Sequence, residues 1–311
     1  MLIEAALFII GLILLVKGAD LFVGGGSGLA YRFGITPSFI GFTVVAFGTS
    51  LPEFVVSVNA AVTGNPGIAT GNIIGSNIAN IALVLALCGL LNPGALDPHN
   101  PMNRGVQRQA LFMLLATALF ILLAWPGTLT APIGAVFLIG FLVMLRTLWI
   151  KGAEPDQLKK NPKGFLDYLM TAGGIAAVII GAQLVVTSAV EIALFFGVSA
   201  FIIGVTIVAI GTSLPELATS GAAILRGQSG ITVGNLLGSN IFNLLFVMGI
   251  VSLITNIPIP EQGDLLAMAV FSLAAIPITL GGKRLTRTVS LVVLIGYCIY
   301  IGHITGFLQG F

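Results

Sequence analysis

Residues 41–53 read GFTVVAFGTSLPE, and residues 204–216 read GVTIVAIGTSLPE, with ten of thirteen positions identical. A second pair of stretches follows each copy. Residues 71–80 read GNIIGSNIAN and residues 234–243 read GNLLGSNIFN, with seven of ten positions identical. Both pairs lie the same 163 positions apart (204 minus 41, and 234 minus 71), and the register holds without a gap over more than sixty residues. The chain therefore contains two copies of one structural unit.

The composition indicates a membrane protein. Hydrophobic residues make up 57% of the 311-residue chain and charged residues only 8%, whereas about 25% of the residues of a soluble domain are charged. About 20 apolar residues cross the hydrocarbon core as a helix. Ten apolar segments of this kind lie at residues 5–31, 36–62, 68–92, 106–124, 128–149, 166–195, 199–225, 230–255, 264–280 and 288–308. We therefore expect an all-α membrane protein with ten transmembrane helices.

The basic residues predict the orientation of these helices. With ten spans, twelve of the thirteen Lys and Arg residues fall in or beside the odd-numbered connections, and the even-numbered connections contain none. The positive-inside rule makes the odd-numbered side cytoplasmic, so both termini are expected to be extracellular. The thirteenth basic residue, Lys17, lies within the first span. It precedes Asp20 by three positions on the same helix face, and we expect the two to form an ion pair.

The duplicated unit contains five of the ten helices. Because five is odd, the two units enter the membrane in opposite orientations, and such inverted repeats are an architecture of many secondary transporters. We expect a first five-helix repeat at residues 1–150, a cytoplasmic linker at 151–165 and a second five-helix repeat at 166–311.

Each GTSLPE copy places one glutamate, Glu53 or Glu216, in an apolar span with no Lys or Arg nearby in the sequence. An ionised carboxylate is costly in the bilayer unless something compensates its charge. One explanation is a protonated glutamate that is hydrogen-bonded between helices. The other is that mobile cations provide the opposite charge. We favour cations because the arrangement occurs twice, at equivalent positions.

The residues around each glutamate add further oxygen ligands. Pro52 and Pro215 lack an N–H group, so the carbonyl groups four residues earlier lose their helical partners. Broken helices are tolerated in membranes where the freed carbonyls line a polar cavity or site. Hydroxyl side chains at i−4 and i−3 from each glutamate share its helix face: Thr49, Ser50, Thr212 and Ser213. Oxygen ligands of this kind suit Ca²⁺ and Na⁺, and no soft sulfur or imidazole ligand accompanies them.

The second motif, GNxxGSNxxN, contains small and polar residues. Its glycines recur at a spacing of four, which lets helices pack closely. Its serine and last asparagine are also four apart and share one face, as Ser76 with Asn80 and Ser239 with Asn243. Packing alone would explain the glycines, whereas the duplicated polar pairs favour coordination of a cation or hydrogen bonds to the glutamates. Two ionised glutamates balance one Ca²⁺ or two Na⁺, so competition for one site is a physical basis for exchange.

The two duplicated motifs closely resemble the alpha repeats of the sodium/calcium exchangers in the cation/calcium exchanger superfamily. The resemblance implies ten helices, with helices 2, 3, 7 and 8 around a central site and alternating access by sliding of helices 1 and 6. It also implies exchange of three Na⁺ for one Ca²⁺. By motif position, it implies ion ligands at Glu53, Glu216, Thr49, Thr212, Ser50, Ser213, Ser76 and Ser239, the carbonyls of Ala46 and Ala209, and Asn80 and Asn243 beside them.

Within the resembled superfamily, potassium-dependent relatives and some archaeal or bacterial relatives have an aspartate at position 243 or its repeat mate. Asparagine at both position 80 and position 243 therefore argues against potassium dependence without excluding it. Proton-coupled calcium exchangers generally lack this GTSLPE form, and proton-coupled cation antiport is the alternative. A channel and an intramembrane enzyme are further alternatives. The inverted repeat favours opposed gates over a continuous pore, and no nucleophile or catalytic metal set accompanies the glutamates.

We therefore expect a multi-pass antiporter of the plasma membrane, not an enzyme. Its ligands are transported Ca²⁺ and Na⁺ and its surroundings are the lipid bilayer. We expect no cofactor, no nucleic acid and no obligatory protein partner. Asp20 and Glu191 also lie in apolar spans, but they lack the symmetry of the two glutamates. For them we expect local pairing or a position near the membrane surface.

Overall fold

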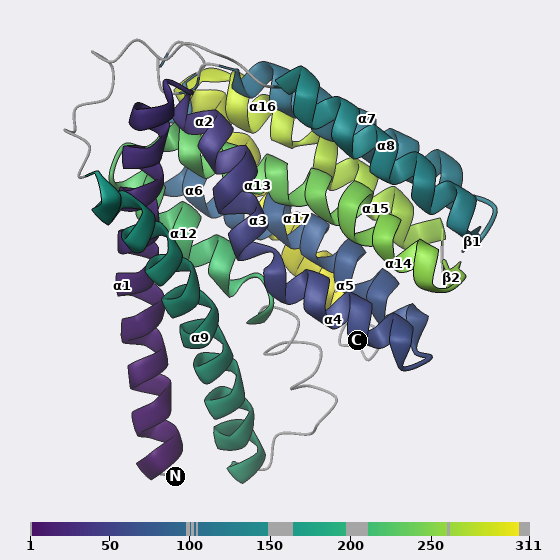
Figure 1. The fold of residues 1–311 in the computed structure, drawn as a ribbon, viewed down its shortest axis with the longest axis horizontal. Helices are drawn as coiled ribbons and strands as arrows, with labels where there is room; N and C mark the ends of the chain where they lie inside the picture. Colours follow the sequence, from purple (N-terminus) through teal and green to yellow (C-terminus); the bar gives the residue numbers. More distant parts are fainter. Residues whose placement is uncertain are drawn as a thin grey trace.

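The computed structural model describes residues 2–97, 100, 103, 105–148, 164–196, 211–259 and 262–304. The described chain is almost entirely helical (Figure 1). The first half contains α1 (Leu2–Phe33), α2 (Pro37–Ile40), η1 (Gly41–Val45), α3 (Ala46–Thr49), α4 (Leu51–Val62), α5 (Pro66–Ala79), η2 (Asn80–Leu85), α6 (Ala86–Leu91), α7 (Val106–Ala124) and α8 (Ala131–Leu148), of which η1 and η2 are π-helical.

The second half contains α9 (Phe165–Phe195), α12 (Leu214–Leu225), α13 (Ser229–Ile241), η6 (Phe242–Val247), α14 (Met248–Ile254), α15 (Gln262–Leu273), α16 (Ala275–Leu280) and α17 (Gly282–Ile304), of which η6 is π-helical. Equivalent elements of the two halves keep the sequence register, since α4 and α12 begin and end at positions 163 apart (214 minus 51, and 225 minus 62).

Nine of the ten expected spans are apolar helices in the described residues. Eight helices are long and apolar enough to cross a membrane. A ninth span is the pair formed by residues 37–49 and 51–62, which is bent by 46° at the break between its parts. The tenth expected span, 199–225, lies partly outside the described residues, and its described part contains α12. The count of ten, the linker at 151–165 and the extracellular termini stay predictions.

Glycines allow α1 and α9 to pack closely as an antiparallel pair (Figure 1). A Cβ atom added at Gly174 of α9 would lie 2.5 Å from the backbone nitrogen of Phe22, and one added at Gly11 of α1 would lie 2.9 Å from that of Val185. A side chain at either glycine would therefore collide with the backbone of the other helix. This seam of small residues brings the two helix axes together, as small residues commonly do in membranes.

The centre of the protein is formed by α13, whose thirteen residues are all buried. It packs against the helix that contains α2, η1 and α3, because Gly234 and Gly238 let the two backbones approach. A Cβ atom added at Gly238 would lie 2.8 Å from the Cα atom of Phe42. The close packing expected at the motif glycines is thus confirmed for α13. Near Gly71 and Gly75 of α5, no atom of the described chain lies within 4 Å of an added Cβ atom.

Two short strands join loops that the predicted topology places on one side of the membrane. β1 (Thr128–Leu129) lies between α7 and α8, and β2 (Ile257–Pro258) lies between α14 and α15. They pair antiparallel, with Thr128 opposite Pro258 and Leu129 opposite Ile257. Both loops are even-numbered connections without Lys or Arg, so their pairing agrees with the predicted topology.

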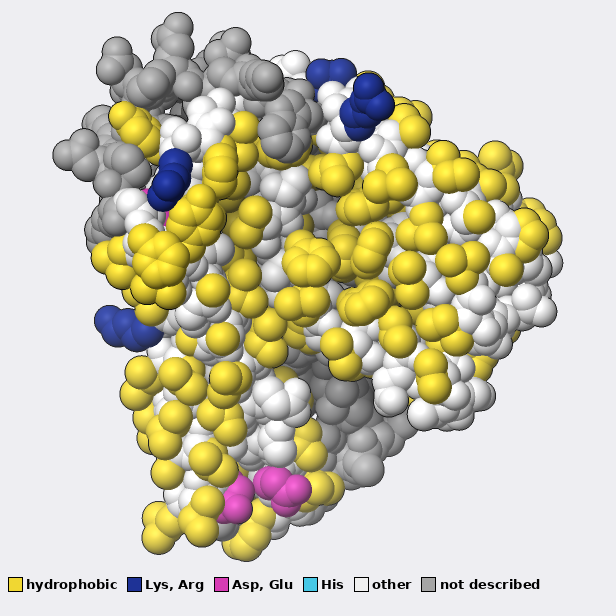
Figure 2. Space-filling model, viewed as in Figure 1, with side chains coloured by type: hydrophobic (Ala, Val, Ile, Leu, Met, Phe, Trp, Pro, Cys, Tyr) yellow, Lys and Arg dark blue, Asp and Glu magenta, His cyan; other side chains and the backbone are white. Residues whose placement is uncertain are grey.

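The surface matches that of a membrane protein. Figure 2 shows hydrophobic side chains over most of the visible face, with Lys and Arg mainly toward one end of the molecule and Asp and Glu near the opposite end. Many of the exposed side chains are large aliphatic and aromatic residues. Together with the apolar helices, this surface makes the chain a multi-pass membrane protein.

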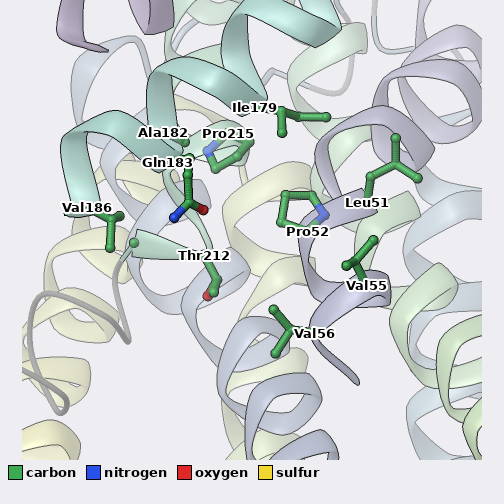
Figure 3. Close-up of a pocket in the computed structure, with 11 residues that line it drawn as sticks. Leu51, Pro52, Val55, Val56, Ile179, Ala182, Gln183, Val186, Thr212 and Pro215 are labelled. Atoms are coloured by element: carbon green, nitrogen blue, oxygen red, sulfur yellow. The ribbon is translucent and has the colours of Figure 1, made fainter. Parts of the chain in front are cut away.

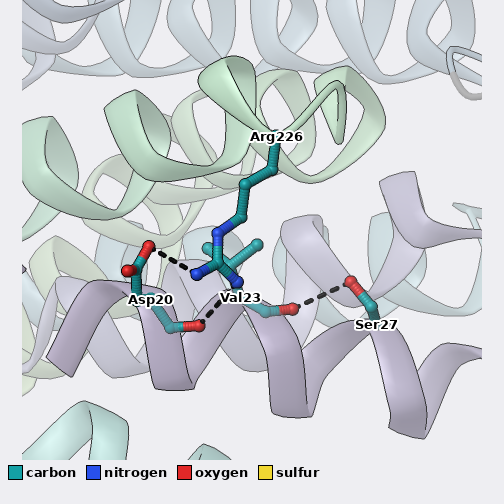
Figure 4. Close-up of polar contacts among 4 residues, drawn as sticks. All are labelled: Asp20, Val23, Ser27 and Arg226. Carbon is teal, nitrogen blue, oxygen red and sulfur yellow. Dashed lines mark hydrogen bonds and ion pairs between the residues drawn. The ribbon is translucent and has the colours of Figure 1, made fainter. Parts of the chain in front are cut away.

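The expected ion pair between Lys17 and Asp20 is wrong, because Asp20 pairs with Arg226 (Figure 4). A guanidinium nitrogen of Arg226 lies 2.8 Å from Asp20 Oδ1, and the other donates to the Asp20 backbone oxygen at 3.2 Å. Ser27 of α1 is also within hydrogen-bond distance of Gln228, at 3.0 Å. Lys17 is exposed. The loop after α12 is thus tied to α1 by contacts that are distant in sequence.

Candidate ion-binding site

Two serines at equivalent positions mark the breaks that place the glutamates. Ser50 has φ −89° and ψ 8°, and Ser213 has φ −89° and ψ 4°. A proline occupies the second residue of the helix that follows each serine. Glu53 and Glu216 therefore lie in the first turns of α4 and α12. The partial positive charge at a helix N-terminus favours a carboxylate there, so the local fold compensates part of the cost of each buried charge.

The two carboxylates are buried and approach one another between the repeats. Glu53 is 1% exposed and Glu216 is 0% exposed, and Ser50, three residues before Glu53, donates a hydrogen bond to Glu216. One oxygen of each, Oε2, is buried and has no hydrogen-bond partner in the part of the chain that the structure describes. Within the described part of the chain, neither carboxylate has a Lys or Arg partner. The centre of the protein thus holds two acidic groups that no Lys or Arg of the described residues neutralises.

Serine hydroxyls surround the other carboxylate oxygens. Ser50 Oγ donates to Glu216 Oε1 at 3.0 Å. Ser239 lies 3.5 Å from the same oxygen, and Ser76 lies 3.5 Å from Glu53 Oε1. The last two distances are at the outer limit of hydrogen bonding. Helices α5 and α13 therefore present their motif serines to the carboxylates of α4 and α12, and residues from both halves of the chain form one polar cluster.

Asparagines that the sequence reasoning did not single out support this cluster. Asn235 Nδ2 donates to Ser220 Oγ at 3.0 Å, and Asn235 Oδ1 accepts from Thr49 Oγ1 at 3.0 Å. In the first repeat, Asn72 donates to Ser57 Oγ at 3.0 Å and to the backbone oxygen of Glu53 at 3.1 Å. Both asparagines belong to the duplicated GNxxGSNxxN stretches, and their exact repetition was the signal that could have identified them.

Asn80 and Asn243 join the cluster through two further asparagines of the same motif. Asn80 Nδ2 donates to Asn240 Oδ1 at 3.0 Å, and Asn243 Nδ2 donates to Asn77 Oδ1 at 3.2 Å. All four side chains are at most 1% exposed. The two halves of the chain therefore meet at a buried group of amides next to the motif serines.

The remaining expected ligands are placed less uniformly. Ser213 is buried, and its hydroxyl has no hydrogen-bond partner within the described ranges of the chain. Thr212 is half-buried. The Ala46 carbonyl accepts from the backbone nitrogen of Ser50 at 3.0 Å and lies 3.4 Å from Thr49 Oγ1. Ala209 lies outside the described residues.

A cavity of about 540 Å³ approaches the cluster between α4, α9 and the segment before α12 (Figure 3). Its walls are mainly apolar, with Gln183 and Thr212 as polar side chains. Pro52 and Pro215, from the two motifs, face it from opposite sides (Figure 3). The cavity thus reaches the two helix breaks.

The cluster offers hard oxygen ligands in a buried setting. Carboxylate, hydroxyl and amide oxygens are the groups that Ca²⁺ and Na⁺ take, and Ca²⁺ accepts six to eight of them in flexible geometry. A cation at this place would balance the two carboxylates, which are otherwise costly to ionise away from water. The arrangement is therefore suited to binding a hard cation reversibly.

Comparison with known proteins agrees with this geometry. The family model for sodium/calcium exchanger proteins matches residues 3–150 and 166–306. The chain is 40% identical over 265 residues to the putative antiporter CaxA of Alkalimonas amylolytica, covering 82% of each protein. It is 28% identical over 301 residues to the sodium/calcium exchanger MaX1 of Methanosarcina acetivorans, covering 82% of this chain and 84% of that protein.

A solved structure shows the same fold. The sodium-calcium exchanger NCX_Mj superposes with a TM-score of 0.81 at 33% sequence identity, covering 97% of this chain and 98% of that one. The sequence resemblance to exchangers is therefore confirmed by the family model, by relatives over most of the chain and by the fold. The chain belongs to the sodium/calcium exchanger family.

Proposed function

We propose that the chain exchanges Na⁺ for Ca²⁺ across the plasma membrane, by alternating access at the cluster around Glu53 and Glu216. The family is one of ion exchangers rather than of enzymes. Antiport of Ca²⁺ against another cation follows from membership of the sodium/calcium exchanger family. That the other cation is Na⁺ is what we propose. Ca²⁺ and Na⁺ are substrates, and the mechanism uses no bound cofactor.

The observation that carries the proposal is the pair of buried, unneutralised glutamates. Each keeps one carboxylate oxygen without a hydrogen-bond partner from the described residues. The structural alternative, protonated glutamates bonded between helices, would use a carboxyl proton to satisfy an acceptor. In the described chain, Oε2 of each glutamate has no polar neighbour within hydrogen-bond distance, so a proton on that oxygen would find no acceptor. Mobile cations therefore explain the pair better than a structural role does.

The charge of the site supports exchange rather than simultaneous binding. The two ionised glutamates carry a charge of −2, which one Ca²⁺ or two Na⁺ neutralise. Excess charge of either sign in a buried site costs free energy, because the charge has lost its contact with water. Full loading with both ions would leave uncompensated positive charge, so each ion displaces the other.

The fold supports alternating access. The carboxylates stand at breaks in two helices, and irregular backbone at membrane depth occurs where it lines a site. The cavity reaches these breaks beside α9. The resemblance assigns sliding to helices 1 and 6, which are α1 and α9, and their glycine seam brings backbone against backbone. Because this seam holds α1 and α9 against each other, the two helices can move as one unit against the rest of the protein.

The test is uptake of ⁴⁵Ca²⁺ into proteoliposomes loaded with Na⁺, with K⁺-loaded and choline-loaded vesicles as controls. Uptake that needs internal Na⁺ and persists when a protonophore collapses the proton gradient is the expected result. Uptake that follows a proton gradient would assign proton coupling instead. Uptake that is indifferent to both gradients would indicate a channel and contradict exchange.

A further inference from the structure

Four asparagines form a crossed hydrogen-bond network at the meeting point of α5 and α13. Asn77 Nδ2 lies 3.3 Å from the backbone oxygen of Asn240, and Asn240 Nδ2 lies 3.1 Å from the backbone oxygen of Asn77. The two residues occupy equivalent positions of the repeats, 163 apart. Each amide group therefore donates to the main chain of the opposite repeat.

These two bonds fix which way the amides point. A backbone carbonyl oxygen only accepts hydrogen bonds, so the amide nitrogens of Asn77 and Asn240 must face the opposite backbone. Their side-chain oxygens must then face the next neighbours, which are Asn243 and Asn80. A rotation of either amide by half a turn would place oxygen against oxygen.

The orientation of the Asn77 and Asn240 amides determines that of Asn80 and Asn243. Because Asn240 Oδ1 and Asn77 Oδ1 only accept, Asn80 and Asn243 must present their NH₂ groups to them, at 3.0 Å and 3.2 Å. Their own Oδ1 atoms are left facing elsewhere. Both of these oxygens are buried and have no hydrogen-bond partner among the described residues, which is uncommon for amide oxygens inside a protein.

Asn80 and Asn243 lie on the side of the helices that carries the ion cluster. Asn80 and Asn243 follow Ser76 and Ser239 by four positions, so each shares a helix face with a serine beside a glutamate. The helix also changes pitch here, since η2 begins at Asn80 and η6 begins one residue before Asn243. Such π-helical turns frequently occur at functional sites.

We propose that Asn77 and Asn240 are positioning residues, which hold the amides of Asn243 and Asn80 with their oxygens toward the transported cation. This inference rests on the proposed function and adds how the neutral ligands are oriented. Amide oxygens add coordination without adding charge, so the site keeps its charge of −2. The pairing is crossed, because Asn77 orients Asn243 of the other repeat and Asn240 orients Asn80.

The crossed pairing makes a distinctive prediction for Asn77→Ala. The substitution removes the acceptor for Asn243, but it retains the Asn77 backbone oxygen that orients Asn240. Asn80 should therefore stay in place. Asn77 should be coupled to Asn243 and independent of Asn80, although Asn80 is its near neighbour on the same helix. A purely structural role would couple Asn77 to its own helix instead.

The experiment is a set of double-mutant cycles on Ca²⁺ affinity, measured by ⁴⁵Ca²⁺ binding to the purified full-length protein, with the melting temperature as a check of folding. Asn77→Ala and Asn243→Ala should each weaken Ca²⁺ binding by about tenfold, as loss of a ligand or of the group that orients it does. The double variant of Asn77→Ala and Asn243→Ala should bind Ca²⁺ about as weakly as the weaker-binding of the two single variants. In the double variant of Asn77→Ala and Asn80→Ala, the two losses of Ca²⁺ affinity should multiply.

The inference is overturned if Asn77→Ala leaves the Ca²⁺ affinity unchanged. It is also overturned if the losses of affinity multiply when Asn77→Ala and Asn243→Ala are combined. The cycle of Asn240→Ala with Asn80→Ala tests the same arrangement at the equivalent position, should Asn77→Ala fail to fold. Wild-type protein that does not bind Ca²⁺, or Glu216→Gln that binds it normally, would instead refute the proposed function. If Glu216→Gln loses Ca²⁺ binding as expected, but the losses of affinity in Asn77→Ala and Asn243→Ala multiply, the positioning role alone is refuted.

Discussion

The hydroxyl of Ser50, in the first repeat, donates to Glu216 of the second repeat across 3.0 Å, while the equivalent hydroxyl of Ser213 has no partner among the described residues. The two residues have the same backbone conformation and the same burial. Only one of two equivalent bonds is therefore made. Inverted repeats that alternate between two states must differ from one another in either state, because identical repeats would open both sides equally, and this bond is one such difference.

This difference predicts unequal effects of two identical substitutions. Ser50→Ala should destabilise the cation-free protein by about 1 kcal/mol, because it removes a hydrogen bond to a carboxylate. Ser213→Ala removes a buried hydroxyl that has no partner and should leave stability nearly unchanged. Thermal unfolding of both variants in cation-free detergent solution measures the difference. A larger loss of stability in Ser213→Ala would contradict the asymmetry.

Substitution of either motif glutamate should abolish Ca²⁺ transport. Glu53→Gln and Glu216→Gln keep the shape of the side chain but remove half of the site's charge. A cation then no longer meets enough negative charge to offset its dehydration. ⁴⁵Ca²⁺ uptake into Na⁺-loaded vesicles measures the effect, and the melting temperature shows that the variants are folded.

Glu191→Gln is the matched control, because Glu191 lies on α9 and is exposed. It should transport Ca²⁺ at close to the wild-type rate. Near-normal uptake by Glu53→Gln or Glu216→Gln would remove these residues from the site.

The ion pair between Asp20 and Arg226 should influence the rate of exchange but not the affinity for Ca²⁺. Its side chains are 38% exposed for Arg226 and 35% for Asp20, and pairs of this kind contribute about 0.2–1 kcal/mol. Asp20→Asn should therefore change the exchange rate by no more than about fivefold, provided that α1 moves relative to α12. The measurement compares initial exchange rates with equilibrium binding. A large change in Ca²⁺ affinity would show that the pair belongs to the site instead.

The seam between α1 and α9 predicts a contrast between two adjacent glycines. An alanine at Gly174 would place its Cβ atom 2.5 Å from the backbone nitrogen of Phe22, whereas one at Gly173 would meet nothing in the described chain within 4 Å. Gly174→Ala should destabilise the protein by about 1–3 kcal/mol, as overpacking does, and should slow exchange. Gly173→Ala should do neither. Equal melting temperatures and exchange rates for the two variants would show that this seam is not tightly packed.

The sequence predicted those parts of the fold and cluster that repeat or that depend on local pattern. The duplicated GTSLPE predicted two helix breaks, and Ser50 and Ser213 show them with matching dihedral angles where both are described. The apolar segments predicted the helix positions, because the length of a membrane span is set by the bilayer.

The sequence did not predict contacts between distant segments. Local spacing suggested Lys17 as the partner of Asp20, but Arg226 lies 206 positions away and approaches only after α1 and α12 have packed. The same is true of the bond from Ser50 to Glu216, 166 positions apart. Asn77 and Asn240 were missed although they are identical in the two repeats, because their role depends on backbone oxygens of the opposite helix.

The most direct test of the central claim is competition between Na⁺ and ⁴⁵Ca²⁺ for the purified protein. If Glu53 and Glu216 hold either ion, Na⁺ should displace bound Ca²⁺ completely, with K⁺ at the same ionic strength as the control for screening. The Glu53→Gln and Glu216→Gln variants should show little Ca²⁺ to displace. Ca²⁺ binding that is insensitive to Na⁺ beyond the effect of K⁺, or that survives both substitutions, would contradict a shared site at the two glutamates.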